Sequence, residues 1–391
     1  MKNNETNKYD IIGDIHGRFD KLTDHLTRLG YRRGDDHNIH HPEGRKVLFL
    51  GDYIDRGENN RDTLHLVKEM VDAGTATALM GNHEFNAVLM ETEGPEGKTL
   101  RPRRENTDRT RAEFDEFPGE WATWIDWFKS LPMWIDFGDF RAVHATWDEK
   151  SMEIIGDRTL RDETFLRAAG TKGTPEFDAV EIVLKGHELK LPEGVSFFDK
   201  DGKERFKTRA RWWGFDDDAP LTFGDIAMPP GSLENNAPVP REKVKTIPRY
   251  PESAPPVFVG HYWMDKDAPK EPVGPNVVIL DYSAGMDGPV VSYRWNPGDT
   301  VSKEAFVVGE VEDDALRTEG ETPTVVDAVK TSFIVDEEGL PWEIGAGFVK
   351  LVGAAEPLSD DKRARLTRTI LSGSMGVSKE EAIRISLDLK K

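Results

Sequence analysis

The stretch YDIIGDIHGRFDKL, residues 9–22, joins an apolar run to a turn that holds an aspartate and a histidine between two glycines. The apolar run is typical of a buried strand, and the residues after the turn repeat apolar side chains at helical spacing as far as Gly30. The same form recurs at 46–57 (KVLFLGDYIDRG) and at 76–84 (ATALMGNHE), each time before a helical pattern. Strands that alternate with helices predict βα units and a mostly parallel sheet.

Each of the three predicted turns carries side chains that can bind a metal ion or a phosphate group: Asp14 and His16, then Asp52, Asp55 and Arg56, then Asn82 and His83. Because the carboxyl ends of neighbouring parallel strands converge on one crevice, we expect these groups to face one another. Asp14 and His16 stand two positions apart in an extended segment, so their side chains point the same way and can chelate one cation. The mixture of nitrogen and oxygen donors suits Mn, Fe, Zn or a similar divalent ion.

Charge and residue type favour phosphate chemistry at this site. If Asp14 and Asp52 are the only anionic ligands, two divalent ions leave a surplus of about +2, which attracts a phosphate dianion and lowers the pKa of a bridging water. The resulting hydroxide would attack phosphorus directly, without a phosphoenzyme. The planar guanidinium of Arg56 can bind phosphate oxygens. His83 is the predicted acid that protonates the leaving group, and Asp55 is predicted to orient it.

The blocks GDIHG, GDYIDRG and GNHE together resemble the signature of the phosphoprotein phosphatase family of calcineurin-like metallophosphoesterases. That family includes serine/threonine phosphatases and bacterial diadenosine tetraphosphate hydrolases, and this chain resembles a divergent bacterial-type member. The resemblance implies an α/β fold, a β-sandwich flanked by helices, with a dinuclear metal site at the carboxyl ends of the strands. It also implies which residues bind metal: Asp14, His16 and Asp52 the first ion, and Asp52, Asn82 and two later histidines the second.

Two later histidines are needed to complete the second site. FRAVHATW, 140–147, is similar to the strand-ending VHAG or VHGG of the family, so His144 is the first, although Thr146 and Trp147 replace the small residues expected after it. For the second, His187 in VLKGHE and His261 in VFVGHYW each follow an apolar run, interpreted as a strand, and a glycine. We favour His261, because the family's last histidine is followed closely by further strands, and residues 276–295 supply them.

Arginines elsewhere in the chain are candidates for binding phosphate. The family has a second phosphate-binding arginine between the two histidine strands, and Arg209 or Arg211 in KTRARWWG are the candidates. The segment 98–111, KTLRPRRENTDRTR, holds five arginines and can receive a second phosphate or an acidic substrate, although a solvated loop is the default interpretation. His25 and His65 lie within helical patterns and are expected at the surface.

Composition excludes several classes of protein. The chain has 391 residues, a net charge of −20 and no cysteine, so disulfides, thiolate zinc sites and cysteine-dependent phosphatases are ruled out. The negative charge disfavours broad binding to nucleic acid. Because no apolar stretch approaches the roughly 18 residues that span a bilayer, we expect no membrane association and a cytoplasmic location.

Domain boundaries follow changes in pattern along the chain. Residues 1–300 are expected to form one catalytic domain, because the resemblance covers about 9–297. Within it, the βα rhythm fails from about 188 to 256, where we expect an insertion with a hairpin and a proline-rich loop. Residues 301–391 form an extension of unknown role, with helices predicted at 359–373 and 378–391.

The function that the sequence favours is metal-dependent hydrolysis of phosphomonoesters, with protein phosphoserine or phosphothreonine as the substrate and two ions, Mn²⁺ first among them, as cofactors. The alternative is a hydrolase of dinucleoside polyphosphates or of nucleotide or phosphodiester substrates, which the arginine-rich segment supports. A catalytically inactive phosphate-binding scaffold would lack a ligand or the acid, and none of these residues is missing.

Overall fold

A computed structural model describes residues 7–34, 38–117, 119–199, 202–214 and 220–309, and the backbone of three short strands beyond them. Those strands are β17 (Ser332–Val335), β18 (Pro341–Gly345) and β19 (Phe348–Leu351), which form an antiparallel sheet. The two helices predicted near the C-terminus lie outside the described residues. The limits of the predicted domains therefore stay predictions.

The first sheet has five strands in the order β16-β15-β1-β4-β5. Its members are β1 (Tyr9–Ile12), β4 (Lys46–Phe49), β5 (Ala76–Ala78), β15 (Val291–Trp295) and β16 (Phe306–Val308). Strands β1, β4 and β5 are parallel, as the repeated strand-turn-helix pattern predicts, and β15 pairs antiparallel with β1. The three motif-bearing turns therefore leave the same edge of one sheet.

The second sheet has the order β14-β13-β7-β6. Its strands are β6 (Trp134–Asp136), β7 (Arg141–Val143), β13 (Val257–Val259) and β14 (Val277–Ile279). Aromatic side chains join the two sheets: the ring of Phe258 in β13 lies 4.9 Å from that of Tyr293 and 5.7 Å from that of Trp295 in β15. The predicted β-sandwich is thus present, and its core lies between these sheets.

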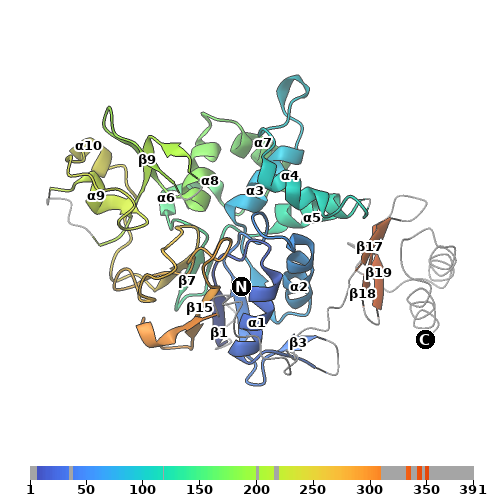
Figure 1. Ribbon diagram of the computed structural model, residues 1–391. Helices are drawn as coiled ribbons and strands as arrows, with labels where there is room; N and C mark the ends of the chain where they lie inside the picture. The colour runs from blue at the N-terminus through green and yellow to red at the C-terminus, as the bar shows by residue number, and fades with distance from the viewer. Residues whose placement is uncertain are drawn as a thin grey trace.

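Helices flank the sandwich (Figure 1). They are α1 (Phe19–Leu29), α2 (Asn60–Asp72), α3 (Asn82–Glu91), α4 (Glu105–Ala112), α5 (Glu120–Ser130), α6 (Glu149–Ile155), α7 (Glu163–Gly170) and α8 (Pro175–Lys185). Helix α1 buries Leu22, Leu26 and Leu29 and ends at Gly30, whose φ of 101° lets its N–H bond the last carbonyls. None of the helices within the described residues is long and apolar enough to cross a membrane.

The predicted insertion contains more regular structure than a hairpin and a loop. The hairpin is present as β9 (Phe197–Phe198) and β10 (Glu204–Arg205), which pair antiparallel. Beside it, β8 (Glu188–Lys190), β11 (Lys207–Ala210) and β12 (Ala227–Met228) form a third sheet. The proline-rich part includes the short helices α9 (Phe223–Ile226) and α10 (Arg241–Val244).

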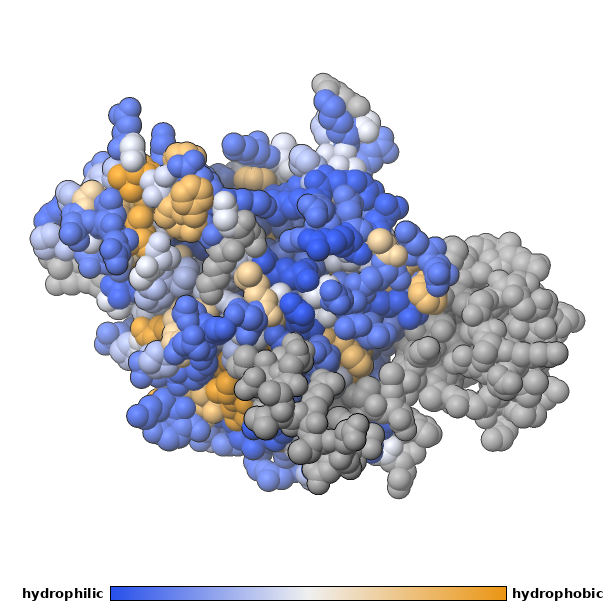
Figure 2. Space-filling model, viewed as in Figure 1, coloured by the Kyte–Doolittle hydropathy of each residue, from blue (hydrophilic) through white to orange (hydrophobic). Residues whose placement is uncertain are grey.

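Short elements complete the described chain. A hairpin of β2 (Arg32–Arg33) and β3 (Ile39–His40) follows α1, and single 3₁₀ turns occur at Pro95–Gly97 and Lys303–Ala305. Hydrophilic side chains cover most of the face seen in Figure 2, and apolar patches gather at its upper left, over the region of α9 and β9.

Candidate metal centre

The turns after β1, β4 and β13 have unusual backbone geometry. His16, Asp52, Asp55, Arg56 and His261 all have φ between 53° and 73°, a left-handed conformation that costs an L-residue roughly 1–2 kcal/mol. Such conformations persist where the surrounding structure enforces them, and they cluster at functional sites. All five are among the residues that the sequence motifs singled out.

Glycines directly before Asp14, Asn82 and His261 allow the backbones to approach closely. A Cβ atom on Gly81 would lie 2.2 Å from the amide nitrogen and from Oδ1 of Asp52, and one on Gly260 would lie 2.0 Å from Oδ1 of Asp14. Gly13 is equally crowded, against the carbonyl of Leu280 at 2.2 Å. Only glycine fits at these positions without displacing the loops, which explains the recurring Gly-Asp, Gly-Asn and Gly-His pairs.

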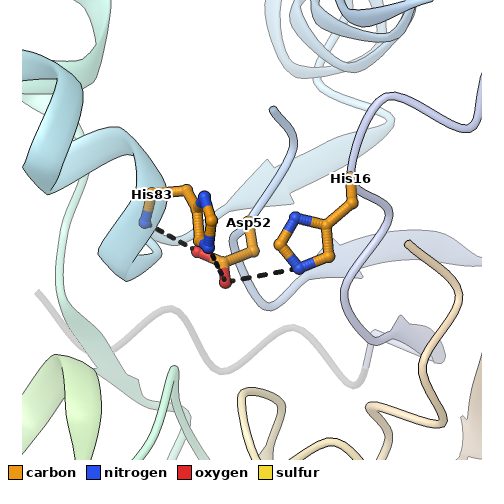
Figure 3. A group of neighbouring side chains, drawn as sticks. All are labelled: His16, Asp52 and His83. Carbon is orange, nitrogen blue, oxygen red and sulfur yellow. Dashed lines mark hydrogen bonds and ion pairs between the residues drawn. The ribbon is translucent and has the colours of Figure 1, made fainter. Parts of the chain in front are cut away.

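The carboxylate of Asp52 is the centre of the cluster. Its Oδ2 atom lies 3.7 Å from Nε2 of His16, 3.4 Å from Nε2 of His144 and 3.9 Å from Nε2 of His83. Figure 3 shows His16 and His83 pointing toward Asp52 from opposite sides. Two sets of potential ligand atoms share this residue: His16, Asp52 and His83 form one, and Asp52, His144 and His261 the other.

Backbone carbonyls fix the orientation of three histidine rings. Nδ1 of His16 donates to the carbonyl of Ile54 at 2.9 Å, Nδ1 of His144 to that of Leu50 at 2.8 Å, and Nε2 of His261 to that of Lys185 at 3.0 Å. In the neutral rings of His16 and His261 the other nitrogen is then an acceptor that faces the cluster. Burial lowers the pKa of His144, but the carboxylate of Asp52 outweighs it and the pKa lies above its ordinary value. Within the described part of the chain, Nε2 of His16 and Nδ1 of His261 are buried and accept no hydrogen bond.

These inward-facing acceptors meet carboxylate oxygens, which are also acceptors. Asp14 is buried, accepts the backbone N–H of His261 at 3.1 Å, and places Oδ2 at 3.9 Å from Nε2 of His16. Burial, followed by the nearby carboxylates of Asp281 and Asp52, raises the pKa of Asp14 well above its ordinary value. Two buried imidazole nitrogens that accept no hydrogen bond, beside buried carboxylates, fit cations, and this set of nitrogen and oxygen atoms is typical of a divalent metal site.

Asn82 begins α3 and lies beside the second set of ligands. Its Oδ1 atom is 3.2 Å from Nε2 of His144. The structure therefore brings together the six residues that the sequence analysis proposed as metal ligands: Asp14, His16, Asp52, Asn82, His144 and His261.

His83 and Asp55 form the pair that the sequence analysis expected beside the metal ligands. Nδ1 of His83 lies 2.6 Å from Oδ2 of Asp55, and the side chain of His83 borders the open cleft. Burial lowers the pKa of His83, but the carboxylates of Asp52 and Asp55 outweigh it and the pKa lies above its ordinary value. A charged imidazole held beside the cleft can supply a proton.

The predicted arginines differ in position. Arg56 and Arg209 line a cleft of about 1270 Å³ that opens from His83 and His261. The guanidinium of Arg56 stacks on the ring of Trp263, with 3.7 Å from Cζ to the ring centroid. Arg211 does not line this cleft, and its backbone N–H donates to the carbonyl of Ile226, the last residue of α9.

The prediction that a strand precedes His187 is wrong. Residues 175–185 form α8, and His187 follows the end of that helix, where its Nε2 atom lies 3.0 Å from the hydroxyl of Thr246. His187 belongs neither to the cleft lining nor to the two ligand sets found among the described residues. His261, which does follow a strand, occupies the predicted position.

Two acidic residues at the site were missed by the sequence analysis. Glu84 accepts the backbone N–H groups of Asp52, Tyr53 and Gly81 at 2.9, 2.8 and 3.0 Å, and it closes the capping box of α3. Burial and then the charge of Asp52 raise the pKa of Glu84 to about 7. The acid at the third position of a helix was the available signal.

Asp281 is the second missed residue. It is buried and accepts the backbone N–H groups of Trp263 at 2.8 Å and Ser283 at 2.9 Å. It thereby fixes the turn after His261 and the ring on which Arg56 stacks. No spacing in the sequence distinguishes it from a turn aspartate.

The chain is similar to several known proteins. A family model of calcineurin-like phosphoesterases matches residues 8–209. An asymmetrical bis(5'-nucleosyl)-tetraphosphatase of Halalkalibacterium halodurans is 42% identical over 78 residues, 19% of this chain and 30% of the relative. The chain thus spans less than a third of that relative's length. A protein of the same name from Oceanobacillus iheyensis is 26% identical over 204 residues, 49% of this chain and 74% of the relative.

One solved structure is similar to most of the chain. It is described as the crystal structure of a putative diadenosine tetraphosphatase, and it shares 15% identity with this chain. The match covers 78% of this chain and 96% of that protein's chain, with a TM-score of 0.38.

Proposed function

Because the chain belongs to the calcineurin-like phosphoesterase family, we propose that it is a metal-dependent hydrolase of phosphate esters and anhydrides. The observation that carries this proposal is the position of Asp52, which belongs to two sets of potential metal-ligand atoms and lies beside the His83–Asp55 pair. A structural cluster of the same composition would need donors between its acceptors, and the inward-facing atoms of His16 and His261 have none among the described residues.

Six residues would hold two divalent ions, with Mn²⁺ as the first choice: Asp14, His16 and Asp52 one ion, and Asp52, Asn82, His144 and His261 the other. Bound ions would polarise the phosphate, neutralise its charge and lower the pKa of water. Asp52 would contribute to both sites, because it belongs to both sets of potential ligand atoms.

The chain's own side chains bind the phosphate and move the proton. Arg56 is suited to hold phosphate oxygens, because stacking on Trp263 fixes the plane of its guanidinium. Arg209 lines the same cleft and is the better of the two candidates for the second phosphate-binding arginine. His83 would donate a proton from Nε2 to the leaving oxygen, while Asp55 holds its Nδ1–H.

For the substrate, we favour a dinucleoside polyphosphate. The curated relatives are bis(5'-nucleosyl)-tetraphosphatases, and the cleft extends well beyond the candidate metal ligands. Lys and Arg side chains provide eight of the residues that line it, although the chain as a whole carries a net charge of −20. Seven acidic residues also line it, so attraction for a substrate with several negative groups depends on the basic residues that have no acidic partner.

Protein phosphoserine or phosphothreonine is the second candidate substrate. It is favoured by the resemblance of the three motifs to the phosphoprotein phosphatases, which act at comparable sites on monoesters. The difference between the candidates lies in the number of linked phosphates that the cleft must accommodate.

A substrate panel tests the proposal. We would measure kcat/KM with Mn²⁺ for diadenosine tetraphosphate, a phosphoserine peptide, p-nitrophenyl phosphate and a phosphodiester. The proposal predicts metal-dependent hydrolysis, with diadenosine tetraphosphate preferred by at least tenfold. A preference for the phosphopeptide would replace the substrate class, and absence of hydrolysis across the panel would contradict the enzyme itself.

A further inference from the structure

The basic residues of the cleft differ in whether an acid neutralises them. Four have acidic partners: Arg101 and Lys185 share Glu181, Arg205 pairs with Asp199, and Lys207 pairs with Glu188 at 3.1 Å. In these ion pairs the carboxylates neutralise the positive charges of the cleft wall. They leave little net attraction for a ligand at those positions.

Arg104 and Arg209 are different, because neither makes an ion pair or a side-chain hydrogen bond with any residue in the described ranges. They come from different parts of the fold. Arg104 immediately precedes α4, and Arg209 lies in β11. Arg104 is an exposed residue and Arg209 a half-buried one. Partial burial, followed by the charge of Arg101, lowers the pKa of Arg104, and the carboxylates of Glu181 and Asp55 oppose this shift.

The helix that follows Arg104 is anchored to the acid pair of the candidate site. The hydroxyls of Thr107 and Thr110 in α4 donate to the two carboxylate oxygens of Asp55, at 2.9 and 2.8 Å. The same carboxylate binds Nδ1 of His83 at 2.6 Å. Helix α4, which follows Arg104, is therefore anchored to the carboxylate that binds the predicted proton donor, and Arg104 and His83 line the same cleft.

We propose that Arg104 forms a second phosphate subsite, on the leaving-group side of His83, which binds a phosphate linked to the one that is attacked. The subsite is distinct from that of Arg56 and Arg209, which would hold the phosphate at the candidate metal ligands. The Arg104 subsite rests on the proposed function and narrows its substrate class to compounds with at least two linked phosphates. The planar fork of an arginine is suited to two oxygens of such a group.

The first test compares Arg104→Gln with Arg103→Gln. Arg103 neighbours Arg104 and is exposed, but it pairs with Asp108 and Glu91 and does not line the cleft, so it is a matched control. We expect Arg104→Gln to raise KM for diadenosine tetraphosphate by at least tenfold more than it raises KM for p-nitrophenyl phosphate. Arg103→Gln should change neither by more than about twofold, as is usual for exposed ion pairs.

The second test does not depend on turnover. Calorimetric titration with inorganic tripolyphosphate and with inorganic phosphate, in the presence of Mn²⁺, measures the subsite directly. We expect Arg104→Gln to weaken tripolyphosphate binding at least tenfold and phosphate binding less than threefold. Arg104→Lys should recover part of the loss, because a lysine keeps the charge without the planar fork.

The outcomes separate the two proposals. If the wild-type protein hydrolyses no member of the panel, the proposed function fails, while the tripolyphosphate titration still decides the subsite. If Arg104→Gln lowers the affinity for phosphate and tripolyphosphate equally, or lowers neither, the subsite is wrong even when diadenosine tetraphosphate is hydrolysed.

Discussion

Nδ1 of His83 lies 2.6 Å from Oδ2 of Asp55, a residue 28 positions away in the sequence. Hydrogen bonds from Thr107 and Thr110 fix the carboxylate in turn. The pair therefore has a single orientation, in which Nε2 of His83 faces the cluster around Asp52. This arrangement gives His83 a role that differs from that of the metal ligands next to it.

Replacing His83 with Ala should lower kcat by about 10²- to 10⁴-fold for a substrate with a poor leaving group, the range expected for loss of a general acid. The effect should be smaller for p-nitrophenyl phosphate, because nitrophenolate leaves without needing a proton. Metal content, measured by mass spectrometry of the purified protein, should stay at the wild-type level. Equal losses for both leaving groups would exclude the acid role.

Replacing His261 with Ala should remove one metal ion per chain. The prediction follows from the buried Nδ1 atom of His261, which faces the cluster without a hydrogen-bond partner among the described residues. His187→Ala is the control, because His187 follows a glycine in the same way but bonds Thr246 instead. Metal analysis of the two variants would reverse the assignment if only the His187 variant lost metal.

Glu84→Gln should destabilise the loops that carry Asp52 and Asn82. The amide keeps one oxygen acceptor but turns an NH₂ group toward backbone N–H donors, which leaves buried groups unsatisfied at a cost of about 1–3 kcal/mol. Urea unfolding measures this cost directly. A variant with unchanged stability and unchanged metal affinity would show that Glu84 does not hold these loops.

His25 should make stability depend on pH. Burial, then the charge of Arg28, lowers its pKa from 6.5 to about 3. Between these values the unfolded chain binds a proton that the folded chain does not, so the free energy of unfolding falls as pH drops from about 6.5 toward 3. In His25→Gln that fall should be less steep in urea titrations at several pH values. Identical slopes for variant and wild type would contradict a neutral buried imidazole.

The sequence predicts the part of the fold and site that local motifs encode. The ligands Asp14, His16, Asp52 and Asn82 each stand within a few residues of a strand end, beside glycines that the close approach of neighbouring loops requires. Local pattern was therefore sufficient to place them on one edge of the parallel sheet.

Contacts between distant segments could not be predicted in this way. His25 and His65 were expected at the surface, but both are buried, against Ser292 and Glu120, which lie 267 and 55 positions away. The link from Asp55 to Thr107 and Thr110 likewise depends on how α4 docks. The spacing of residues in the sequence does not indicate contacts between segments so far apart.

The error at His187 has a different physical origin. Val180, Val183 and Leu184 follow helical spacing and are buried on one face of α8. The short apolar run before Gly186 resembles a strand when it is considered alone, because brief apolar runs fit either structure. The longer window from Pro175, with a threonine cap before it, favours the helix.

The measurement that tests the central claim most directly is metal-dependent turnover of diadenosine tetraphosphate by the wild-type protein. We predict that chelator treatment followed by desalting abolishes hydrolysis, and that Mn²⁺ restores it with two ions bound per chain. Hydrolysis that persists in the metal-free protein would contradict the account, because the cluster around Asp52 would then have no part in the reaction.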